Sequence, residues 1–71
     1  MNTKAALEEA VSRAGGVTRM AEAVGVVQPA VSNWLSRGRT PANKCLKIQQ
    51  LTGVSVHRLR PDVFGPPEEV A

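Results

Sequence analysis

The chain has 71 residues, 42% of them hydrophobic, and nine basic against six acidic side chains give it a net charge of +3. This length suits one small domain and leaves no room for separate cofactor and substrate domains. A single cysteine, Cys45, and a single histidine, His57, exclude an internal disulfide and weigh against a structural zinc site. No apolar run approaches the ~20 residues of a membrane span, and the first residues lack the apolar core of a secretory signal. We therefore expect a cytoplasmic protein without metal, cofactor or membrane contact.

The basic residues are concentrated in the middle of the chain. Residues 13–60 carry eight basic side chains against Glu22 alone, whereas residues 1–12 and 61–71 are net acidic. A basic segment of this kind is typical of a nucleic-acid binder, although basic helices are often simply solvated. The charge pattern therefore favours a polyanionic partner without identifying it.

Helical periodicity begins at the first residues. The spacing of apolar residues predicts a first helix from residue 2 or 3 to residue 14, with an inner face of Leu7, Ala10, Val11 and Ala14. A second helix is predicted over residues 18–24, and Gly25 ends it. Pro29 suits the first turn of a helix, so it predicts a third helix to residue 36 with Gln28 at or near its N-cap.

The second half of the chain predicts a longer helix and a short one. Thr40 and Pro41 indicate the start of a fourth helix, with Thr40 as N-cap, which runs to residue 52. Its inward positions are predicted to be Cys45, Leu46, Ile48 and Leu51. Residues 54–59 fit either a fifth helix capped by Ser55 or a short strand, and a strand would make the fold α+β.

The last residues are predicted to be less regular. Residues 60–64 are expected to form a turn that docks Val63 or Phe64 on the core. The composition of residues 65–71, rich in proline and glutamate, is that of a flexible tail. The predicted organisation is therefore one domain over residues 1–64, followed by this tail.

Several conspicuous side chains have a structural interpretation that outweighs a functional one. Trp34 and Cys45 lie on apolar helix faces, so burial is favoured over base stacking and over a redox switch. His57 stands near a helix end, which favours a surface or capping role. For Arg58 and Arg60, a solvated face or an Arg60–Asp62 pair is favoured over contact with DNA. No paired carboxylates, activated nucleophile or phosphate-binding loop indicates an enzyme.

Two short helices joined by a glycine turn form the helix-turn-helix pattern. Residues 17–36, VTRMAEAVGVVQPAVSNWLS, resemble the helix-turn-helix of the Cro and repressor proteins of lambdoid phages. The small Ala21 allows the two helices to approach, and Gly25 suits a turn residue with positive φ. The resemblance places in the core of the motif Met20, Ala21, Val24, Gly25, Val26, Val31 and Trp34.

The resemblance extends over residues 5–64. The stretch VSNW, the basic RGR turn and the terminal LRPDVFG are similar to small Cro-like regulators, including the YdaS-like group of antitoxins. It implies an all-α, five-helix fold of the lambda-repressor type with the helix-turn-helix at its centre.

This resemblance makes the third predicted helix the recognition helix, which lies in the DNA major groove. The positions that face bases would then be Val27, Gln28, Pro29, Ser32 and Asn33. Glutamine and asparagine can bind adenine in a bidentate manner, whereas Val27 and Pro29 offer only apolar contact, for example to a thymine methyl group. The positions implied to meet phosphates are Thr18, Arg19, Ser36, Arg37, Arg39 and Lys44.

The resemblance also implies a function and a partner. One recognition helix contacts few base pairs, so we expect two copies on a two-fold double-stranded operator, either as a weak homodimer or as a dimer formed on DNA. The predicted contact between copies comprises Val56, Leu59, Val63 and Phe64. The leading hypothesis is a phage or prophage transcriptional repressor that acts by occupancy and is nucleoid-associated when bound. An activator, or an antitoxin that holds a toxin and autoregulates through the same domain, remains an alternative.

Overall fold

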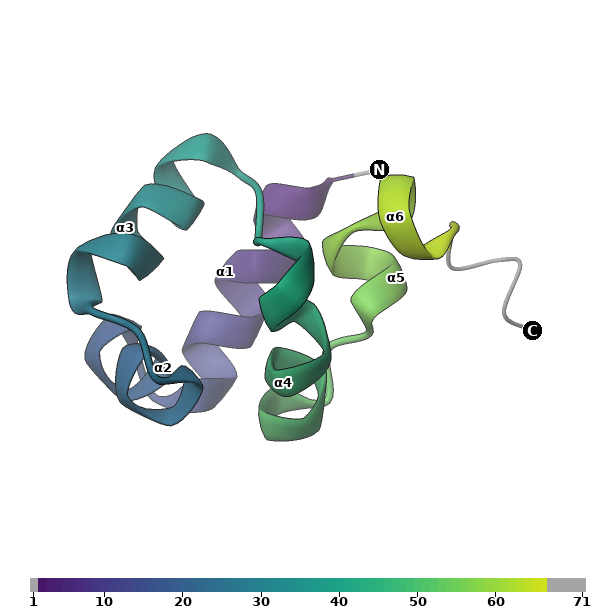
Figure 1. The fold of residues 1–71 in the computed structure, drawn as a ribbon. Helices are drawn as coiled ribbons and strands as arrows, with labels where there is room; N and C mark the ends of the chain where they lie inside the picture. The colour runs from purple at the N-terminus through teal and green to yellow at the C-terminus, as the bar shows by residue number, and fades with distance from the viewer. Residues whose placement is uncertain (1, 67–71) are drawn as a thin grey trace.

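The computed structural model describes residues 2–66, and within them the chain forms six helices and no strand (Figure 1). The helices are α1 (Thr3–Ala14), α2 (Val17–Val24), α3 (Gln28–Arg37), α4 (Ala42–Thr52), α5 (Val56–Leu59) and α6 (Pro61–Phe64). The all-α class is therefore confirmed, and residues 56–59 are helix, not strand. The predicted turn over residues 60–64 contains a sixth short helix. Most of the predicted tail, residues 67–71, lies outside the described residues.

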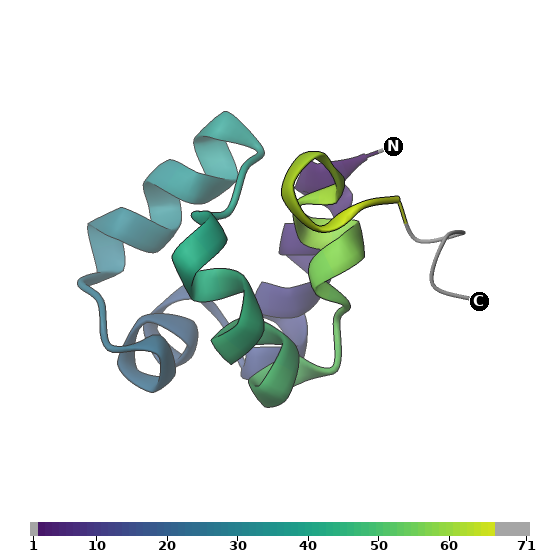
Figure 2. The ribbon, with the colours of Figure 1, turned by 45° about the vertical axis from the view of Figure 1, so that its right-hand side comes forward.

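The helices are arranged around α1. This helix contacts α2, α3, α4 and α5, so it forms the centre of the bundle. The pair α2 and α3 lies at one end of the molecule and the pair α5 and α6 at the other, as both views show (Figures 1 and 2). The two ends meet in one core whose largest fully buried side chains include Leu7, Met20, Ile48 and Leu59.

Two predicted core positions on α4 are wrong. Leu46 and Leu51 are 56% and 45% exposed, whereas Cys45 and Ile48 are fully buried. Successive residues of a helix are rotated by about 100°, so both leucines point well away from the packed Cys45–Ile48 side. The apolar pattern of α4 is wider than the surface it buries.

The predicted N-cap of α4 is also wrong. The helix begins at Ala42 with Pro41 as its N-cap and with no side-chain cap. Thr40 is instead 1% exposed, and its hydroxyl has no hydrogen-bond partner among the described residues. Its carbonyl accepts a hydrogen bond of 3.0 Å from the guanidinium of Arg60. The extended Pro41 (φ −58°, ψ 136°) delays the helix by one residue and leaves Thr40 in the core.

Other local predictions are confirmed. The Ser55 hydroxyl caps α5 by accepting a hydrogen bond of 3.1 Å from the backbone of His57. Arg60 pairs with Asp62 at 2.8 Å. The Cys45 thiol is buried, and this burial raises its pKa, as expected of an unreactive thiol.

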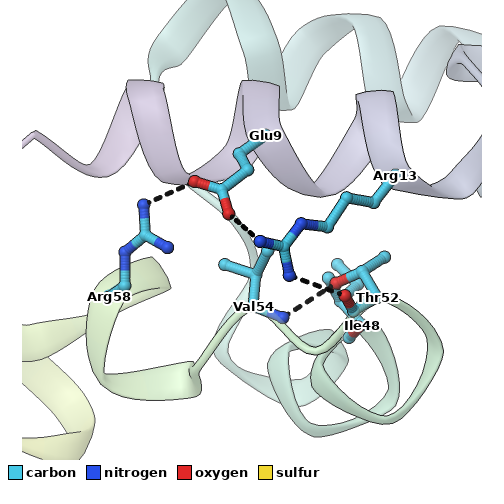
Figure 3. Close-up of polar contacts among 6 residues, drawn as sticks. All are labelled: Glu9, Arg13, Ile48, Thr52, Val54 and Arg58. Carbon is cyan, nitrogen blue, oxygen red and sulfur yellow. Dashed lines mark hydrogen bonds and ion pairs between the residues drawn. The ribbon is translucent and has the colours of Figure 1, made fainter.

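A network of polar contacts joins α1 to α5 and to the end of α4 (Figure 3). The Glu9 carboxylate pairs with Arg13 at 2.7 Å and with Arg58 at 2.8 Å. Arg13 also donates a hydrogen bond of 3.2 Å to the carbonyl of Thr52. The Thr52 hydroxyl donates to the Ile48 carbonyl at 2.8 Å and accepts from the backbone of Val54 at 3.2 Å. One glutamate thus holds two helices that are distant in the sequence.

The carboxylates of these ion pairs have lowered pKa values. The hydrogen bond from Arg60 lowers the pKa of Asp62 from 3.8 to about 2, and the hydrogen bond from Arg58 lowers the pKa of Glu9 below 4.5. A carboxyl group whose pKa is lower in the folded state stabilises the fold above its unfolded pKa. That contribution is lost as the pH falls through the folded value.

We therefore expect the thermal unfolding midpoint to fall as the pH is lowered from about 5 to about 2. The double variant Glu9→Gln/Asp62→Asn should lose part of this dependence, because both shifted carboxylates are absent. Glu8→Gln is the control, since Glu8 is exposed and forms no ion pair within residues 2–66. Parallel curves for the wild type and the double variant, measured by circular dichroism, would contradict the assignment.

Two turn glycines differ in what surrounds them. Gly25 (φ 84°) has open space where a Cβ atom would stand, whereas a Cβ atom at Gly38 (φ 69°) would lie 3.1 Å from the Cβ atom of Lys4. The Gly38 carbonyl also accepts a hydrogen bond of 2.6 Å from Thr3, which holds α1 against this turn.

Alanine at either glycine is expected to destabilise the fold, and more strongly at position 38. The left-handed backbone alone costs about 1–2 kcal/mol for a residue with a Cβ atom. Gly38→Ala should exceed Gly25→Ala because the added contact also pushes on α1. Urea unfolding of both variants measures the difference. Equal losses would show that Lys4 moves aside freely.

Candidate nucleic-acid interface

The α2–α3 pair has the geometry of a helix-turn-helix. Gly25 adopts a left-handed conformation after α2, and the backbone N–H groups of Gly25 and Val26 both donate to the carbonyl of Ala21, at 2.9 and 3.0 Å. The chain then turns through Val27 into α3. Buried Ala21 carries only a methyl group, which allows the two helices to pack closely.

The predicted motif core largely follows the burial seen in the structure. Five of its residues are buried, namely Met20, Ala21, Val24, Val31 and Trp34. Val26 is half-buried and packs against this cluster, and Gly25 is exposed in the turn. The burial of Trp34 leaves little of its ring for stacking on a base.

The outer side of α3 is exposed. It carries all the residues predicted to face bases, Val27, Gln28, Pro29, Ser32 and Asn33, and all are exposed. The helix begins at Gln28, and its N-cap is Val27, which makes no side-chain cap. Gln28 therefore lies next to the N-cap, within the predicted range. Within residues 2–66, the Gln28 and Asn33 side chains make no intramolecular hydrogen bond that would occupy their amides.

The cations predicted to meet phosphates differ from the other arginines in their ion pairing. Arg13, Arg58 and Arg60 are neutralised by Glu9 or Asp62. The remaining predicted cations form no ion pair within residues 2–66: Arg19, Arg37, Arg39 and Lys44. Lys44 is half-buried and the three arginines are exposed, as are Thr18 and Ser36. These four cations lie at the start of α2, at the end of α3, in the turn that follows it and near the start of α4.

A surface hollow of about 280 Å³ lies at the C-terminal end of α3, and no prediction from the sequence included it. It is lined by Trp34, Arg37, Arg39 and Pro41. The chain reverses at Gly38, where the Arg39 N–H donates to the Trp34 carbonyl at 3.1 Å. An apolar wall beside two arginine side chains suits a ligand that has both an anionic group and an apolar part. The Arg-Gly-Arg stretch at the end of α3, which begins three residues after Trp34, was the available signal.

The predicted contact between copies is wrong in half of its residues. Val56 and Leu59 are buried in the core of the chain itself, because the inner side of α5 packs on α1. Val63 and Phe64 are 50% and 36% exposed, so they do not dock on the core as predicted.

The end of α6 is held by His57. Its Nδ1 atom lies 3.2 Å from the Gly65 carbonyl, and its ring meets the Phe64 ring edge to face, with 6.4 Å between centroids. This arrangement agrees with the capping role predicted for the histidine. The exposed α6 patch, defined here as Val63 and Phe64, lies at the end of the molecule opposite α3 (Figure 2).

Two further findings concern residues 2–66. None of their helices has both the length and the apolar character that crossing a membrane requires. They contain no cluster of three or more His, Cys, Asp or Glu side chains placed to hold a metal ion.

Comparisons with known proteins agree with the helix-turn-helix geometry. The family model described as "Bacterial toxin YdaS" matches residues 7–68. The Cro protein of Xfaso 1, a proposed prophage element in Xylella fastidiosa strain Ann-1, is 45% identical to this chain, and the two structures superpose with a TM-score of 0.82. The match covers 92% of this chain and 98% of that one. Among curated proteins, none is significantly similar to the chain.

The resemblance seen in the sequence is therefore confirmed over nearly the whole domain. The family description names a toxin, whereas the sequence resemblance was to antitoxins of the same YdaS-like group, and the two interpretations share the fold. The chain belongs to the YdaS family, and its fold is that of a Cro protein from a prophage element.

Proposed function

We propose that the protein is a sequence-specific, double-stranded DNA-binding transcriptional repressor that acts by occupying its operator. The observation that carries this proposal is the setting of α3. Its outer side offers free amides at Gln28 and Asn33, and the surrounding cations form no ion pair among the described residues. Such an arrangement suits a helix that enters the major groove between two phosphate backbones.

Base reading is assigned to the outer side of α3. Gln28 and Asn33 can each bond N6 and N7 of adenine in a bidentate manner. The Ser32 hydroxyl can donate to or accept from a base edge. Arginine is absent from these positions, so the strongest guanine contact is not available from this helix. The proposed operator is therefore read mainly through A·T pairs.

Phosphate contact is assigned to the ends of the motif. Thr18 and Arg19 at the start of α2 would meet one strand, while Ser36, Arg37, Arg39 and Lys44 would meet the other. The hollow at Trp34 has the chemistry to accept a sugar–phosphate unit, with the phosphate between Arg37 and Arg39 and the sugar against Pro41 and the small exposed part of the indole. These contacts would fix the register of α3 without reading sequence.

Two copies are proposed to bind a two-fold operator with half-sites about 34 Å apart, because one α3 reads too few base pairs. Of the predicted pairing residues only Val63 and Phe64 are at the surface, so dimers are proposed to form mainly on DNA. Binding to a promoter would block polymerase and would place the protein at the nucleoid.

The family description favours a second candidate function. A chain of a toxin family could act in a toxin–antitoxin module, as the antitoxin or adaptor that holds a protein partner and autoregulates through α3. The α6 patch is the exposed apolar feature opposite the proposed DNA surface. Pulldown by the wild type but not by Val63→Ser/Phe64→Ser would favour this function.

Selection from a random duplex pool at about 150 mM salt tests the proposed function, since non-specific binding is weak there. We expect a two-fold motif with half-sites about 10 base pairs apart. Gln28→Ala or Asn33→Ala should erase positions of this motif, while Gln50→Ala, an exposed glutamine on α4, should leave it intact. Bulk binding that is sensitive to salt but enriches no motif would overturn the proposal.

A further inference from the structure

Val27 is the most exposed of the large apolar side chains in residues 2–66, at 69%. It occupies the N-cap of α3, where serine, threonine, aspartate or asparagine would accept a hydrogen bond from the helix. Its backbone carbonyl accepts from Ala30 at 3.0 Å, but its side chain caps nothing. The fold therefore gains nothing evident from an isopropyl group at this position.

Pro29 extends the apolar surface at the same end of α3. It is exposed, has no N–H group and stands in the first turn, where its ring is rigid. Val27 and Pro29 thus lie on either side of Gln28 in the sequence, and neither side chain can form a hydrogen bond. In the major groove, the apolar group that base edges present is the methyl group on C5 of thymine.

We infer, on the basis of the proposed DNA binding, that Val27 with Pro29 beside it reads the C5-methyl group of a pyrimidine. The same methyl group stands on the same ring carbon of 5-methylcytosine. A purely apolar contact does not sense whether the neighbouring group on C4 is an oxygen or an amine. Binding therefore responds to cytosine methylation at this position, where 5-methylcytosine acts like thymine and unmethylated cytosine like uracil.

The expected size of the effect follows from burial of one methyl group. Removing it should weaken binding about fourfold in each half-site, which corresponds to about 0.8 kcal/mol. Removing the methyl group from both half-sites should weaken binding about fifteenfold. Effects of this size are resolved by fluorescence anisotropy with labelled duplexes.

The test uses the operator enriched by selection from the random duplex pool, synthesised with one pyrimidine changed at a time. Two comparisons are made at each position, thymine against uracil and 5-methylcytosine against cytosine, because each pair differs by one methyl group alone. We expect one position per half-site at which both ratios are about four. Val27→Ala should bring both ratios at this position close to one.

Leu51→Ala is the control, since it truncates an exposed apolar side chain on α4 that belongs to neither the proposed DNA surface nor the proposed pairing surface. It should keep both ratios at about four. Alanine is no better a cap than valine, so Val27→Ala should not disturb the start of α3, and Val27→Ser, which can cap it, should lose the ratios with the fold intact.

The outcomes separate this inference from the function on which it rests. A selected motif with ratios near one at every pyrimidine would overturn methyl reading and leave DNA binding in place. Ratios of four that persist in Val27→Ala would assign the contact to other residues and overturn the role of Val27. Selection that yields no motif would overturn the proposed function, and the methyl reading with it.

Discussion

Thr40→Val is expected to raise the free energy of unfolding by about 1–3 kcal/mol, the desolvation penalty of a buried polar group without a partner. The Thr40 hydroxyl is buried and makes no hydrogen bond among the described residues, while valine has the same shape. The bond from Arg60 to the Thr40 carbonyl involves the backbone and survives the change. In a domain of this size each kcal/mol moves the unfolding midpoint by about 4–8 °C.

The matched control is Thr52→Val. The Thr52 hydroxyl donates to Ile48 and accepts from the backbone of Val54, so valine leaves both groups without this partner. This variant should lose about 1–3 kcal/mol. The two substitutions are chemically identical and are expected to have opposite signs in urea unfolding.

A destabilised Thr40→Val would contradict the structure in a specific way. The sequence pattern predicts Thr40 as a helix N-cap, and loss of an N-cap costs about 0.5–2 kcal/mol. The sign of the change therefore decides between the cap expected from the sequence and the buried hydroxyl seen in the structure.

Arg37→Ala/Arg39→Ala is expected to weaken DNA binding about a hundredfold at about 50 mM salt, because each phosphate contact contributes about tenfold there. The slope of log K against log salt should become shallower by about 1.8, or 0.9 for each phosphate. The loss should be similar on matched and unmatched duplexes, since phosphate contacts carry little sequence information.

The control has the same loss of net charge. Arg13→Ala/Arg58→Ala removes two cations that pair with Glu9 away from α3. These ion pairs are exposed, so the stability loss should be small, and the salt slope should stay near that of the wild type. If both double variants lower the slope equally, binding depends on net charge and the two arginines at the hollow have no special role. Lysine at positions 37 and 39 should keep the slope, because it keeps both charges.

Local chemistry explains why most helix boundaries could be predicted. Gly15, Gly25 and Gly53 end helices in the structure as the glycine pattern indicates, and Pro29 stands in the first turn of α3. These signals act within a few residues of the chain. They do not depend on how the helices pack.

The errors in predicted burial arise from packing between helices, which local signals do not report. Leu46 and Leu51 match the apolar pattern of α4 yet remain exposed, and Leu59, taken for a surface contact, fills the core. Burial depends on which helices are neighbours, and a periodic pattern does not contain that information. The helix-turn-helix itself was predictable because its two helices pack on each other across one short turn.

The electrostatics of the candidate site were only half predictable. The sequence shows a basic segment, but it does not show which cations are neutralised. Arg58 meets Glu9 across 49 positions of the chain, and only the folded structure brings them together. The separation of paired from unpaired cations, on which the proposed DNA surface depends, is therefore a product of the tertiary fold.

Because α3 and α6 lie at opposite ends, the spacing between operator half-sites depends on which surface joins two copies. The molecule is 32 Å in its longest dimension, about the pitch of one turn of B-DNA. In two copies joined through Val63 and Phe64, the recognition helices would lie at the far ends of the pair. The distance between them would then be about two molecular lengths, which suits half-sites about two turns apart. Copies that meet through a surface beside α3 suit adjacent turns. The number of base pairs between half-sites therefore reports, from the DNA alone, the surface through which two copies meet.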